Sequence, residues 1–204
     1  MLFVISGPSG CGKTTLIGRV LREFPDARFS VSHTTRPRRP SEVEGREYHF
    51  VSPETFEAMV RSDQFIEWAL VHGHRYGTSR IEIESAPEGV DIVLDVDVQG
   101  ARQIRTGSRR AVFIFVMPPV FPELRLRLIA RGTDSRAEIE TRLRNARREI
   151  LAYGEFDYLV INNDLEPAAD ELRTILRAER LRPGLRAEDI ADILRSFREG
   201  DVLT

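Results

Sequence analysis

The sequence predicts an α/β fold with a parallel central sheet, and two observations support that prediction. Short apolar runs of strand length alternate along the chain with longer stretches of helical periodicity. This alternation is typical of strand, helix, strand units whose crossover helices cover both faces of a parallel sheet. A glycine-rich turn also separates the first apolar run from the first helical stretch. The apolar runs cover residues 2–6, 91–96, 111–117 and 158–161, and the helical stretches cover 13–24, 99–105, 122–130 and 165–180.

Length and composition are those of one globular domain. With 204 residues, of which 41% are hydrophobic and 30% charged, the chain can bury a sizeable core, which argues against disorder. No apolar run approaches the roughly 20 residues of a bilayer-spanning helix, and the apolar amino terminus carries no basic leader. We therefore expect a cytoplasmic protein with no membrane partner. The single cysteine, Cys11, excludes an internal disulfide and every multi-cysteine metal site.

Charge is unevenly distributed along the chain. The 30 basic and 32 acidic side chains give a net charge of −2, yet residues 1–50 and 101–150 carry +3 and +7. Residues 51–100 and 151–204 carry −7 and −5. Two basic segments in an acidic chain favour a polyphosphate held between them over a nucleic-acid track, which usually needs a uniformly basic domain. We therefore expect no nucleic-acid partner.

The turn after the first strand has the pattern G-x-x-x-x-G-K-[ST], in the strand-to-helix context that a phosphate-binding loop requires. Its glycines let successive backbone N–H groups point at phosphate oxygens. Lys13, the only lysine beside 29 arginines, is expected to reach the β and γ phosphates of a nucleoside triphosphate, and the Thr14 hydroxyl to bind Mg²⁺. This predicts a three-layer P-loop NTPase fold. The expected triphosphate-binding loop consists of Gly7, Pro8, Ser9, Gly10, Cys11, Gly12, Lys13 and Thr14.

Between the first helix and the strand at 91 the sequence pattern changes from helical periodicity to short alternating runs. This change predicts an inserted β-rich subdomain over 33–83. Short alternating apolar runs are interrupted there by prolines and arginines. We interpret Trp68 as a core residue, and His72 and His74 as solvated loop residues because no third metal ligand is spaced to join them. The pattern consists of Phe29 alternating with Val31, the proline-rich segment 35–40, Tyr48 and Phe50, a short helix beginning near Pro53, and an apolar run at 65–69.

An arginine-rich segment over 122–153 is the second predicted insertion, and we interpret it as a helical lid. Ser135 is a candidate N-cap for its second helix, with Glu138 completing a capping box. Beyond it, the tail 183–204 contains an amphipathic helical pattern at 188–197. The core of the single domain is assigned to residues 1–32, 84–121 and 154–182.

Two aspartates close the apolar strand at 91–96. The i, i+2 spacing of Asp95 and Asp97 places both carboxylates on one face of the sheet. Ligands of open α/β sheets bind at this edge, so one carboxylate can serve the magnesium shell and the other the second substrate. For each aspartate alone, a helix cap or a turn is the alternative interpretation.

Arginines distinguish among the proteins that carry such a phosphate loop. A phosphoryl-transfer enzyme that works without a partner must supply cations to the transition state itself. The chain offers such cations in both insertions, and it has no Lys-containing guanine loop of the GTPase kind, which favours a kinase with a closing basic lid. The candidate cations are Arg36 and Arg39 in the first insertion and Arg127, Arg131 and Arg142 in the second.

Several motifs in a fixed order together resemble the guanylate kinase family over about residues 2–182. They are more specific as a set than the phosphate loop alone. Beside that loop they comprise Ser32 to Pro40, Gly45 to Phe50, Phe65 to Ala69, Tyr76 to Ser79, Leu94 to Gly100, Arg131 to Thr133 with Arg142 and Leu143, and Ile175 to Leu181.

The resemblance implies the reaction ATP + GMP ⇌ ADP + GDP with Mg²⁺, and a molecule made of core, GMP-binding insertion and lid. Guanine presents N1–H and an amine as donors, which carboxylates accept, and O6 as an acceptor for a hydroxyl, whereas adenine lacks this donor pair. The family positions that hold the GMP phosphate match Ser32, Arg36, Arg39, Tyr48 and Tyr76, of which Ser32 could instead touch the base. Those that read guanine match Glu67, Thr78 and Asp97, those over the ATP phosphates match Arg127, Arg131 and Arg142, and one near the adenine matches Asn162. The expected catalytic set is Lys13, Arg36, Arg131 and Arg142, and the expected metal ligands are Thr14 and Asp95.

Two features depart from the family pattern or lie outside it. The family commonly has Asn-Asp-Asp after the last strand, where this chain has Asn162, Asn163 and Asp164, and the tail from Pro183 lies beyond the match. Two alternatives to a kinase of GMP remain open at this point: a noncatalytic interaction module of the same shape, and a related kinase acting on a phosphorylated sugar. We expect a monomer or a small homo-oligomer.

Overall fold

The structure is a computed structural model that describes residues 1–107, 111–130, 132 and 134–199. Within these residues, the main sheet has five parallel strands in the order β2-β7-β1-β8-β9. This confirms the predicted α/β fold with a parallel central sheet. The strands are β1 (Leu2–Ser6), β2 (Ala27–Phe29), β7 (Asp91–Asp95), β8 (Ala111–Met117) and β9 (Tyr158–Ile161).

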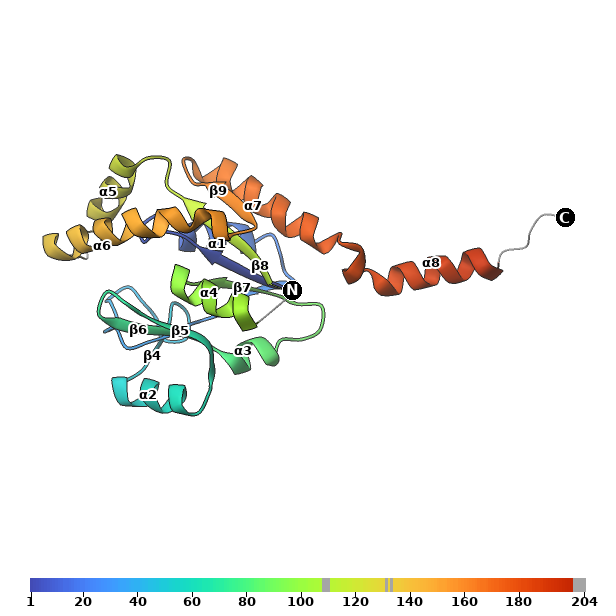
Figure 1. Ribbon diagram of the computed structural model, residues 1–204, viewed down its shortest axis with the longest axis horizontal. Helices are drawn as coiled ribbons and strands as arrows, with labels where there is room; N and C mark the ends of the chain where they lie inside the picture. Colours follow the sequence, from blue (N-terminus) through green and yellow to red (C-terminus); the bar gives the residue numbers. More distant parts are fainter. Residues whose placement is uncertain (108–110, 131, 133, 200–204) are drawn as a thin grey trace.

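Alternate residues of β1 face two different helix layers. Phe3 and Ile5 lie in a buried cluster with residues of α1 (Lys13–Leu21) and α7 (Leu165–Arg180), whereas Val4 lies in a second cluster with residues of α4 (Val98–Gly107). Successive side chains of a strand point to opposite faces, so helices on both sides of the sheet are needed to bury its apolar residues. The result is the three-layer arrangement of Figure 1.

The short strand β2 lies within residues 1–32, which were assigned to the core, although the alternation of Phe29 and Val31 had been grouped with the β-rich pattern of the insertion. Phe29 belongs to β2, which pairs in parallel with β7 through Ala27 to Asp91 and Phe29 to Val93. The alternation of Phe29 and Val31 is therefore that of an edge strand of the core sheet. The short three-residue strand offers little periodicity, and its partner lies far away in the sequence, so local patterning could not assign it.

A second sheet forms within residues 33–83. Its strands have the order β4-β3-β6-β5, and helix α2 (Pro53–Arg61) packs Phe56 against it. Phe56 is fully buried and stacks on Phe65 with ring centroids 4.6 Å apart. Ser52 caps α2, because its Oγ accepts a hydrogen bond from the Thr55 N–H at 3.1 Å. The strands are β3 (His33–Thr34), β4 (His49–Phe50), β5 (Phe65–Val71) and β6 (His74–Ser79), followed by the short helix α3 (Arg80–Glu84).

The second sheet is joined to the core through α4. The Gln103 side chain accepts a hydrogen bond from the Trp68 N–H at 3.1 Å and donates one to the Trp68 carbonyl at 2.8 Å. Trp68 itself was expected in the core, and that prediction is wrong: 39% of the residue is exposed, with its ring edge-on to Phe56. Its neighbours in β5 alternate, so Glu67 and Ala69 take the buried face and leave Trp68 on the other.

The arginine-rich segment forms two helices, α5 (Phe121–Ala130) and α6 (Arg136–Glu149), followed by the 3-10 helix η1 (Ile150–Glu155). The predicted capping box is confirmed. The Glu138 N–H donates to the Ser135 Oγ, and the Ser135 N–H donates to the Glu138 carboxylate. Buried Leu124, Leu128 and Ala146 form the contact between the two helices.

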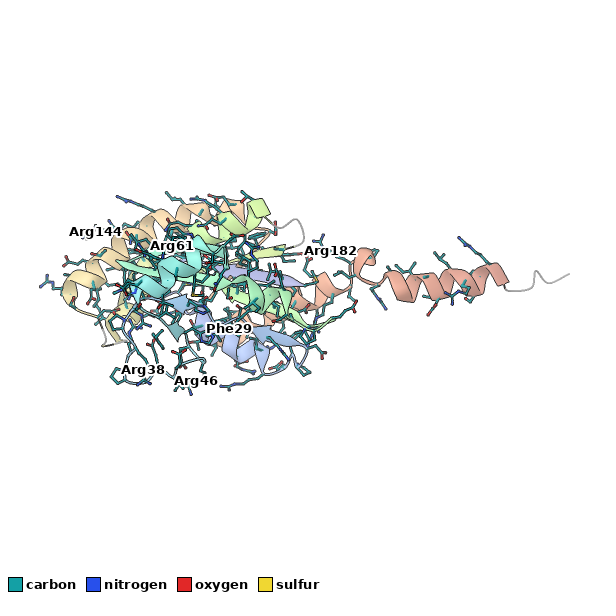
Figure 2. The ribbon with its side chains drawn as sticks, turned by 90° about the horizontal axis from the view of Figure 1, so that it is seen from below. Phe29, Arg38, Arg46, Arg61, Arg144 and Arg182 are labelled. Carbon is teal, nitrogen blue, oxygen red and sulfur yellow. The ribbon has the colours of Figure 1, made fainter. Side chains whose placement is uncertain are left out.

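After α7, the chain continues through the 3-10 helix η2 (Pro183–Leu185) into α8 (Ala187–Glu199), which confirms the amphipathic helix predicted in the tail. Figure 1 shows α8 projecting away from the rest of the molecule, on the side opposite α5, α6 and the second sheet. Figure 2 labels Arg38, Arg46, Arg144 and Arg182 at outer edges of the molecule, where all four are exposed. Many of the arginines are therefore solvated surface residues.

In the described part of the chain, none of the helices is both long and apolar enough to cross a membrane. The division into core, insertion and lid, with the boundaries given above, remains a prediction.

We predict that Phe56→Ala will destabilise the second sheet selectively, by about 3–5 kcal/mol, since a fully buried phenylalanine is removed. Hydrogen exchange measured by mass spectrometry should show faster exchange in residues 49–79 and little change in the main sheet. Leu172→Ala is the matched control, because Leu172 is 1% exposed and belongs to the main-sheet cluster. Equal loss of protection in both sheets after Phe56→Ala would show that they unfold as one unit.

Candidate active site

The phosphate loop runs from β1 into α1 along a path that only glycine permits at two positions. Gly7 has φ of 141°, and a Cβ there would lie 2.1 Å from the Val116 carbonyl oxygen of β8. Gly12 has φ of 93°, and a Cβ there would lie 2.4 Å from the Asn162 Nδ2 after β9. The loop therefore lies directly on the carboxyl ends of the two neighbouring strands, where ligands of open α/β sheets bind.

Lys13 is folded back into this loop. Its Nζ donates to the Gly7 carbonyl at 2.8 Å and to the Pro8 carbonyl at 3.4 Å, and it lies 3.7 Å from the Asp95 Oδ1. Burial alone would lower the pKa of the ammonium, but interactions with Cys11 and Asp95 outweigh burial and raise the pKa. The ammonium therefore stays charged at neutral pH.

Thr14 and Asp95 lie side by side at the open edge of the loop. The Thr14 hydroxyl donates to the Asp95 Oδ2 at 3.0 Å. Both are hard oxygen donors, which suit Mg²⁺, but among the described residues there is no group of three histidine, cysteine, aspartate or glutamate side chains that could hold a metal by itself. A magnesium ion here would need oxygens from a bound nucleotide and from water, as is usual for this metal.

Asn162 and Arg127, expected near the adenine and the ATP phosphates, both contact the backbone of the loop region. The buried Asn162 donates through Nδ2 to the Cys11 carbonyl at 2.7 Å. Arg127 donates to the carbonyls of Asn162 at 2.9 Å and Asn163 at 3.1 Å. These contacts fix the loop against the end of β9. Asn162 and Arg127 therefore have a structural role that their positions in the sequence do not indicate.

Arg142 of α6 reaches the loop from the other side. Its Nη1 donates to the Ser9 Oγ at 2.8 Å, and its Nη2 and Nε contact the Asp134 carboxylate at 3.4 and 3.3 Å. Arg39 contacts the same carboxylate, with its Nη2 3.2 Å from the Asp134 Oδ1. Arg131, predicted in the same set, lies outside the described residues. Asp134 was not predicted, because nothing in the local sequence indicates that it would face two arginines.

Arg36 lies in a cage of aromatic and acidic side chains. Its Nε donates to the Tyr76 hydroxyl at 3.2 Å, its Nη2 donates to the Glu42 Oε1 at 2.7 Å, and its guanidinium lies 5.5 Å from the centre of the Tyr48 ring. The rings of Tyr48 and Tyr76 meet edge-on at 5.6 Å. Burial raises the pKa of Tyr48 to about 12, so its hydroxyl stays protonated. Three predicted GMP-phosphate residues are thus brought together.

Glu42 holds this arrangement, and its role was not predicted from the sequence. It accepts hydrogen bonds from Arg36 and, at 2.8 Å, from the backbone N–H of Arg39. Burial would raise its pKa, but these hydrogen bonds lower the pKa below its ordinary value. A glutamate three residues after an arginine in a loop carries no periodic signal, so only the three-dimensional structure identifies it. Ser32, the remaining predicted residue of this set, lies next to β3 and is half-buried.

Glu67, Thr78 and Asp97 meet near the start of α4. The Thr78 hydroxyl donates to the Glu67 Oε1 at 2.5 Å, and a Cβ on Gly100 would lie 2.4 Å from the Glu67 Oε2. Glu67 is 5% exposed, and burial together with the nearby Asp97 raises its pKa to about 7, although the Thr78 hydrogen bond opposes the shift. The site therefore contains a carboxyl group that changes its charge near neutral pH.

Asp97 is not on the strand with Asp95. β7 ends at Asp95, and Asp97 lies at the beginning of α4, where its Oδ1 accepts the Gly100 N–H at 2.8 Å and its Oδ2 accepts a hydrogen bond from the Gln99 side chain at 2.9 Å. The prediction that both carboxylates share one face of a continuing strand is therefore wrong, and the alternative of a helix cap is confirmed for Asp97. Asp95 faces the loop, and Asp97 faces Glu67.

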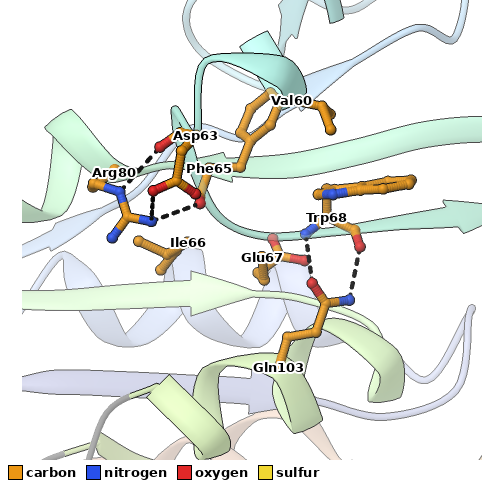
Figure 3. Close-up of a pocket in the computed structure, with 8 residues that line it drawn as sticks. All are labelled: Val60, Asp63, Phe65, Ile66, Glu67, Trp68, Arg80 and Gln103. Carbon is orange, nitrogen blue, oxygen red and sulfur yellow. Dashed lines mark hydrogen bonds and ion pairs between the residues drawn. The ribbon is translucent and has the colours of Figure 1, made fainter. Parts of the chain in front are cut away.

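A cavity of about 230 Å³ lies between β5 and α4, and Glu67 is the one predicted site residue in its lining. Figure 3 shows the Gln103 to Trp68 pair on one side of it and Arg80, which contacts Asp63 and the Phe65 carbonyl, on the other. None of the loop residues lines this cavity, so it is distinct from the phosphate site.

His72 was expected to be a solvated loop residue, and that prediction is wrong. It is half-buried with a positive φ of 52°, and its Nδ1 lies 3.2 Å from the Asn145 Nδ2 of α6. Burial, with the Arg142 charge, lowers its pKa, so the ring is neutral at pH 7. The contact joins the turn between β5 and β6 to α6.

Comparison with known proteins places these features in one family. A family model described as guanylate kinase matches residues 1–179. The guanylate kinase of Syntrophotalea carbinolica is 50% identical over 183 residues, covering 89% of this chain and 87% of its own, and that of Thermotoga maritima is 48% identical over 180 residues, covering 88% and 87%. A crystal structure of guanylate kinase from Anaplasma phagocytophilum superposes with a TM-score of 0.75 at 35% identity, over 89% of this chain and 87% of its own.

Two glycines of one segment provide a test of the loop geometry. Gly12→Ala should lower the free energy of unfolding by about 1–3 kcal/mol, because the new Cβ meets Asn162 and the backbone is left-handed, and it should abolish ATP binding. Gly18→Ala is the matched control. Gly18 lies in α1 with nothing within 4 Å of an added Cβ, so alanine should raise stability by about 0.5–1 kcal/mol and leave binding intact. Chemical denaturation and calorimetric titration with ATP measure both, and unimpaired ATP binding by Gly12→Ala would contradict the assigned loop path.

Proposed function

The chain belongs to the guanylate kinase family, and from this premise we propose how its residues carry out the transfer of the ATP γ-phosphoryl group to GMP. The products are ADP and GDP. One observation carries the proposal: an intact phosphate loop lies in the same molecule as the Glu67, Thr78 and Asp97 cluster. A noncatalytic module of this shape would lack the loop, and a sugar-phosphate kinase would have no use for the cluster, so neither alternative is favoured.

ATP binds with its phosphates in the loop from Gly7 to Thr14. The charged Lys13 ammonium now rests on loop carbonyls, and it turns to the β and γ phosphates when they arrive, because anionic oxygens are stronger acceptors than carbonyls. Arg142, already at Ser9, supplies a second cation to the transferred group. Arg127 contributes to ATP binding indirectly, through its hydrogen bonds to the carbonyls of Asn162 and Asn163. Arg131 is included among the proposed cations because of the family resemblance alone. Asn162 keeps the loop in place beside the adenine.

Mg²⁺ is the proposed cofactor. Thr14 and Asp95 would hold it, Thr14 directly and Asp95 directly or through water, with the remaining positions taken by phosphate oxygens and water. When bound, the ion neutralises charge that develops on the phosphate oxygens during transfer.

GMP binds with its phosphate at Arg36, Arg39, Tyr48 and Tyr76, with Ser32 beside them. Arginine forks fit phosphate oxygens in a bidentate manner, and the cage around Arg36 holds its guanidinium in one orientation before the substrate arrives.

Guanine is selected by Glu67, Thr78 and Asp97. The Glu67 carboxylate accepts the N1–H and amine donors of guanine, with Asp97 beside it, and the Thr78 hydroxyl either donates to O6 or orients Glu67 as it does in the free protein. Adenine would leave a buried carboxylate without donors, which is costly. The expected location in the cytoplasm and the monomeric or small oligomeric state remain predictions.

The protein with ATP and Mg²⁺ should release ADP with GMP as acceptor, and kcat/KM should fall by a factor on the order of 10⁴ with AMP or UMP, because the mismatched bases leave buried polar groups unpaired. A coupled ADP-release assay with each monophosphate measures this. ADP release with GMP no faster than in the blank without acceptor would overturn the proposed activity.

The raised pKa of Glu67 predicts that GMP binding depends on pH. Its pKa of about 7 in the free protein means that the carboxylate form, which guanine requires, is lost as pH falls, so GMP affinity should drop roughly tenfold from pH 8 to pH 6. Calorimetric titration of GMP at pH 6, 7 and 8 tests this directly.

Glu67→Gln is the control for that experiment. The GMP phosphate itself titrates with a pKa of about 6, and the glutamine variant retains this contribution while losing the carboxyl group. The variant should bind GMP weakly with a shallower pH dependence. Identical pH slopes in both proteins would assign the effect to the phosphate and remove Glu67 from it.

A further inference from the structure

Gln103 of α4 binds the backbone of β5 directly beside Glu67, which is proposed to read the base. β5 lies at the end of the strand order β4-β3-β6-β5, so one of its edges faces α4 instead of another strand. The Gln103 Oε1 accepts the Trp68 N–H at 3.1 Å, and its Nε2 donates to the Trp68 carbonyl at 2.8 Å (Figure 3). A neighbouring strand would form this same pair of hydrogen bonds. The amide therefore takes the place of a strand at this edge, one residue beyond Glu67.

The pairing of β5 with β6 is irregular immediately before Glu67. Phe65 pairs with Ser79 and Glu67 with Thr78, so the register shifts between Phe65 and Glu67. Irregularities of this kind bend a strand and change the direction of a side chain. Regular pairing with β6 therefore does not by itself set the direction of the Glu67 carboxylate, and a contact from outside the sheet is needed to do so.

Helix α4 provides two such contacts on one of its faces. Gly100 and Gln103 are three residues apart in this helix, which puts them on the same side. A side chain at Gly100 would overlap the Glu67 carboxylate, so glycine allows the close approach. Asp97 accepts the Gly100 N–H at 2.8 Å, which fixes the second carboxylate to the same turn of the helix. Glu67 thus rests on Gly100, and the next residue of its strand is held by Gln103.

The cavity of about 230 Å³ borders Glu67 on another side, and Ile66, Trp68 and Gln103 also line it. A void offers a side chain no packing contacts, so packing does not hold the carboxylate in that direction. Figure 3 shows Gln103 extending from α4 to the Trp68 backbone beside Glu67. The hydrogen bonds of Gln103 therefore supply a restraint that the cavity does not.

We propose that Gln103 is a positioning residue for base selection: by binding both backbone groups of Trp68, it holds the Glu67 carboxylate beside Asp97. The inference rests on the proposed function for the identity of the base as guanine. The Gln103 amide is directed at the Trp68 backbone, so it acts through Glu67 and not on the base. Both of its hydrogen bonds are exposed and contribute little to overall stability, so a variant without them should fold.

Gln103→Met removes both hydrogen bonds and keeps a side chain of similar length. The KM for GMP should rise about tenfold, because displacement of a recognition group is costly, while kcat and the KM for ATP stay within about twofold of the parent protein. The ratio of kcat/KM for GMP to that for AMP should fall by a similar factor. An equal rise in KM for GMP and for ATP would show that Gln103 only supports the fold, and it would overturn the proposal.

Arg102→Met is the matched control for these measurements. Arg102 is the exposed neighbour of Gln103 on α4, and its side chain pairs with Glu155. A surface ion pair of this kind contributes little, so this variant should keep the parental values of kcat and of both KM constants.

A titration without nucleotide provides the second readout. Carbon-13 NMR of protein labelled at the glutamate carboxyl groups follows Glu67, and Glu67→Gln assigns its signal. The parent protein should show a pKa of about 7, which burial and Asp97 raise against the Thr78 hydrogen bond. In Gln103→Met the carboxylate can move toward the cavity and away from Asp97, so its pKa should fall toward the ordinary value. Arg102→Met should leave the pKa unchanged.

The two readouts together decide the proposal. A folded Gln103→Met protein with the parental KM for GMP and the parental Glu67 pKa overturns it. Should this variant fail to fold, Gln103→Asn keeps the amide but is one methylene too short to bind both groups of Trp68, and it should show the same two changes. Because the titration uses no nucleotide, it stays interpretable if the proposed GMP activity fails, and parental values in an active GMP kinase overturn only the role of Gln103.

Discussion

The site depends on the close passage of the phosphate loop over the ends of β8 and β9. At Gly7 the backbone passes so near the Val116 carbonyl that no side chain fits, and at Gly12 it passes as near to Asn162. These contacts exist because β1 is flanked by β8, with β9 beyond it, in the sheet order. The sheet therefore fixes the positions of the loop, of Lys13 and of the start of α1. The arginines of later segments contact a loop whose position is already fixed.

In the described residues, carboxylates accompany the basic groups proposed to bind phosphates. Lys13 lies near Asp95, Arg36 contacts Glu42, and Arg39 shares Asp134 with Arg142. Binding is then an exchange of one anionic partner for another, and the cations need not be exposed in the free protein. This also explains how a chain with a net charge of −2 can carry a strongly basic site: acidic residues far apart in the sequence are folded against it.

Local pattern and chemistry predicted most of the fold and the loop, whereas residues defined by long-range contacts could not be predicted. The strands at 91–95 and 111–117, the loop glycines and the Ser135 capping box each carry a periodic or motif signal within a few residues. Trp68 was misjudged because hydrophobicity alone does not say which face of β5 is covered. Glu42 was missed because its contacts with Arg36 and the Arg39 N–H form in a loop without periodicity, and Asp134 was missed because one of its partners, Arg39, lies 95 residues away. Asp97 was assigned to the strand because the end of a strand has no sharp sequence signal.

The central position of β1 also constrains the order in which the chain can fold during synthesis. Val4 pairs with Leu94 on one side and with Phe113 on the other, so β1 is synthesised before either of its neighbours. The second sheet, whose strands are all made in the interval, can assemble earlier from nearer contacts. Non-local pairing of this kind slows folding, and it leaves the apolar strand β1 without its sheet partners until β7 and β8 have been made.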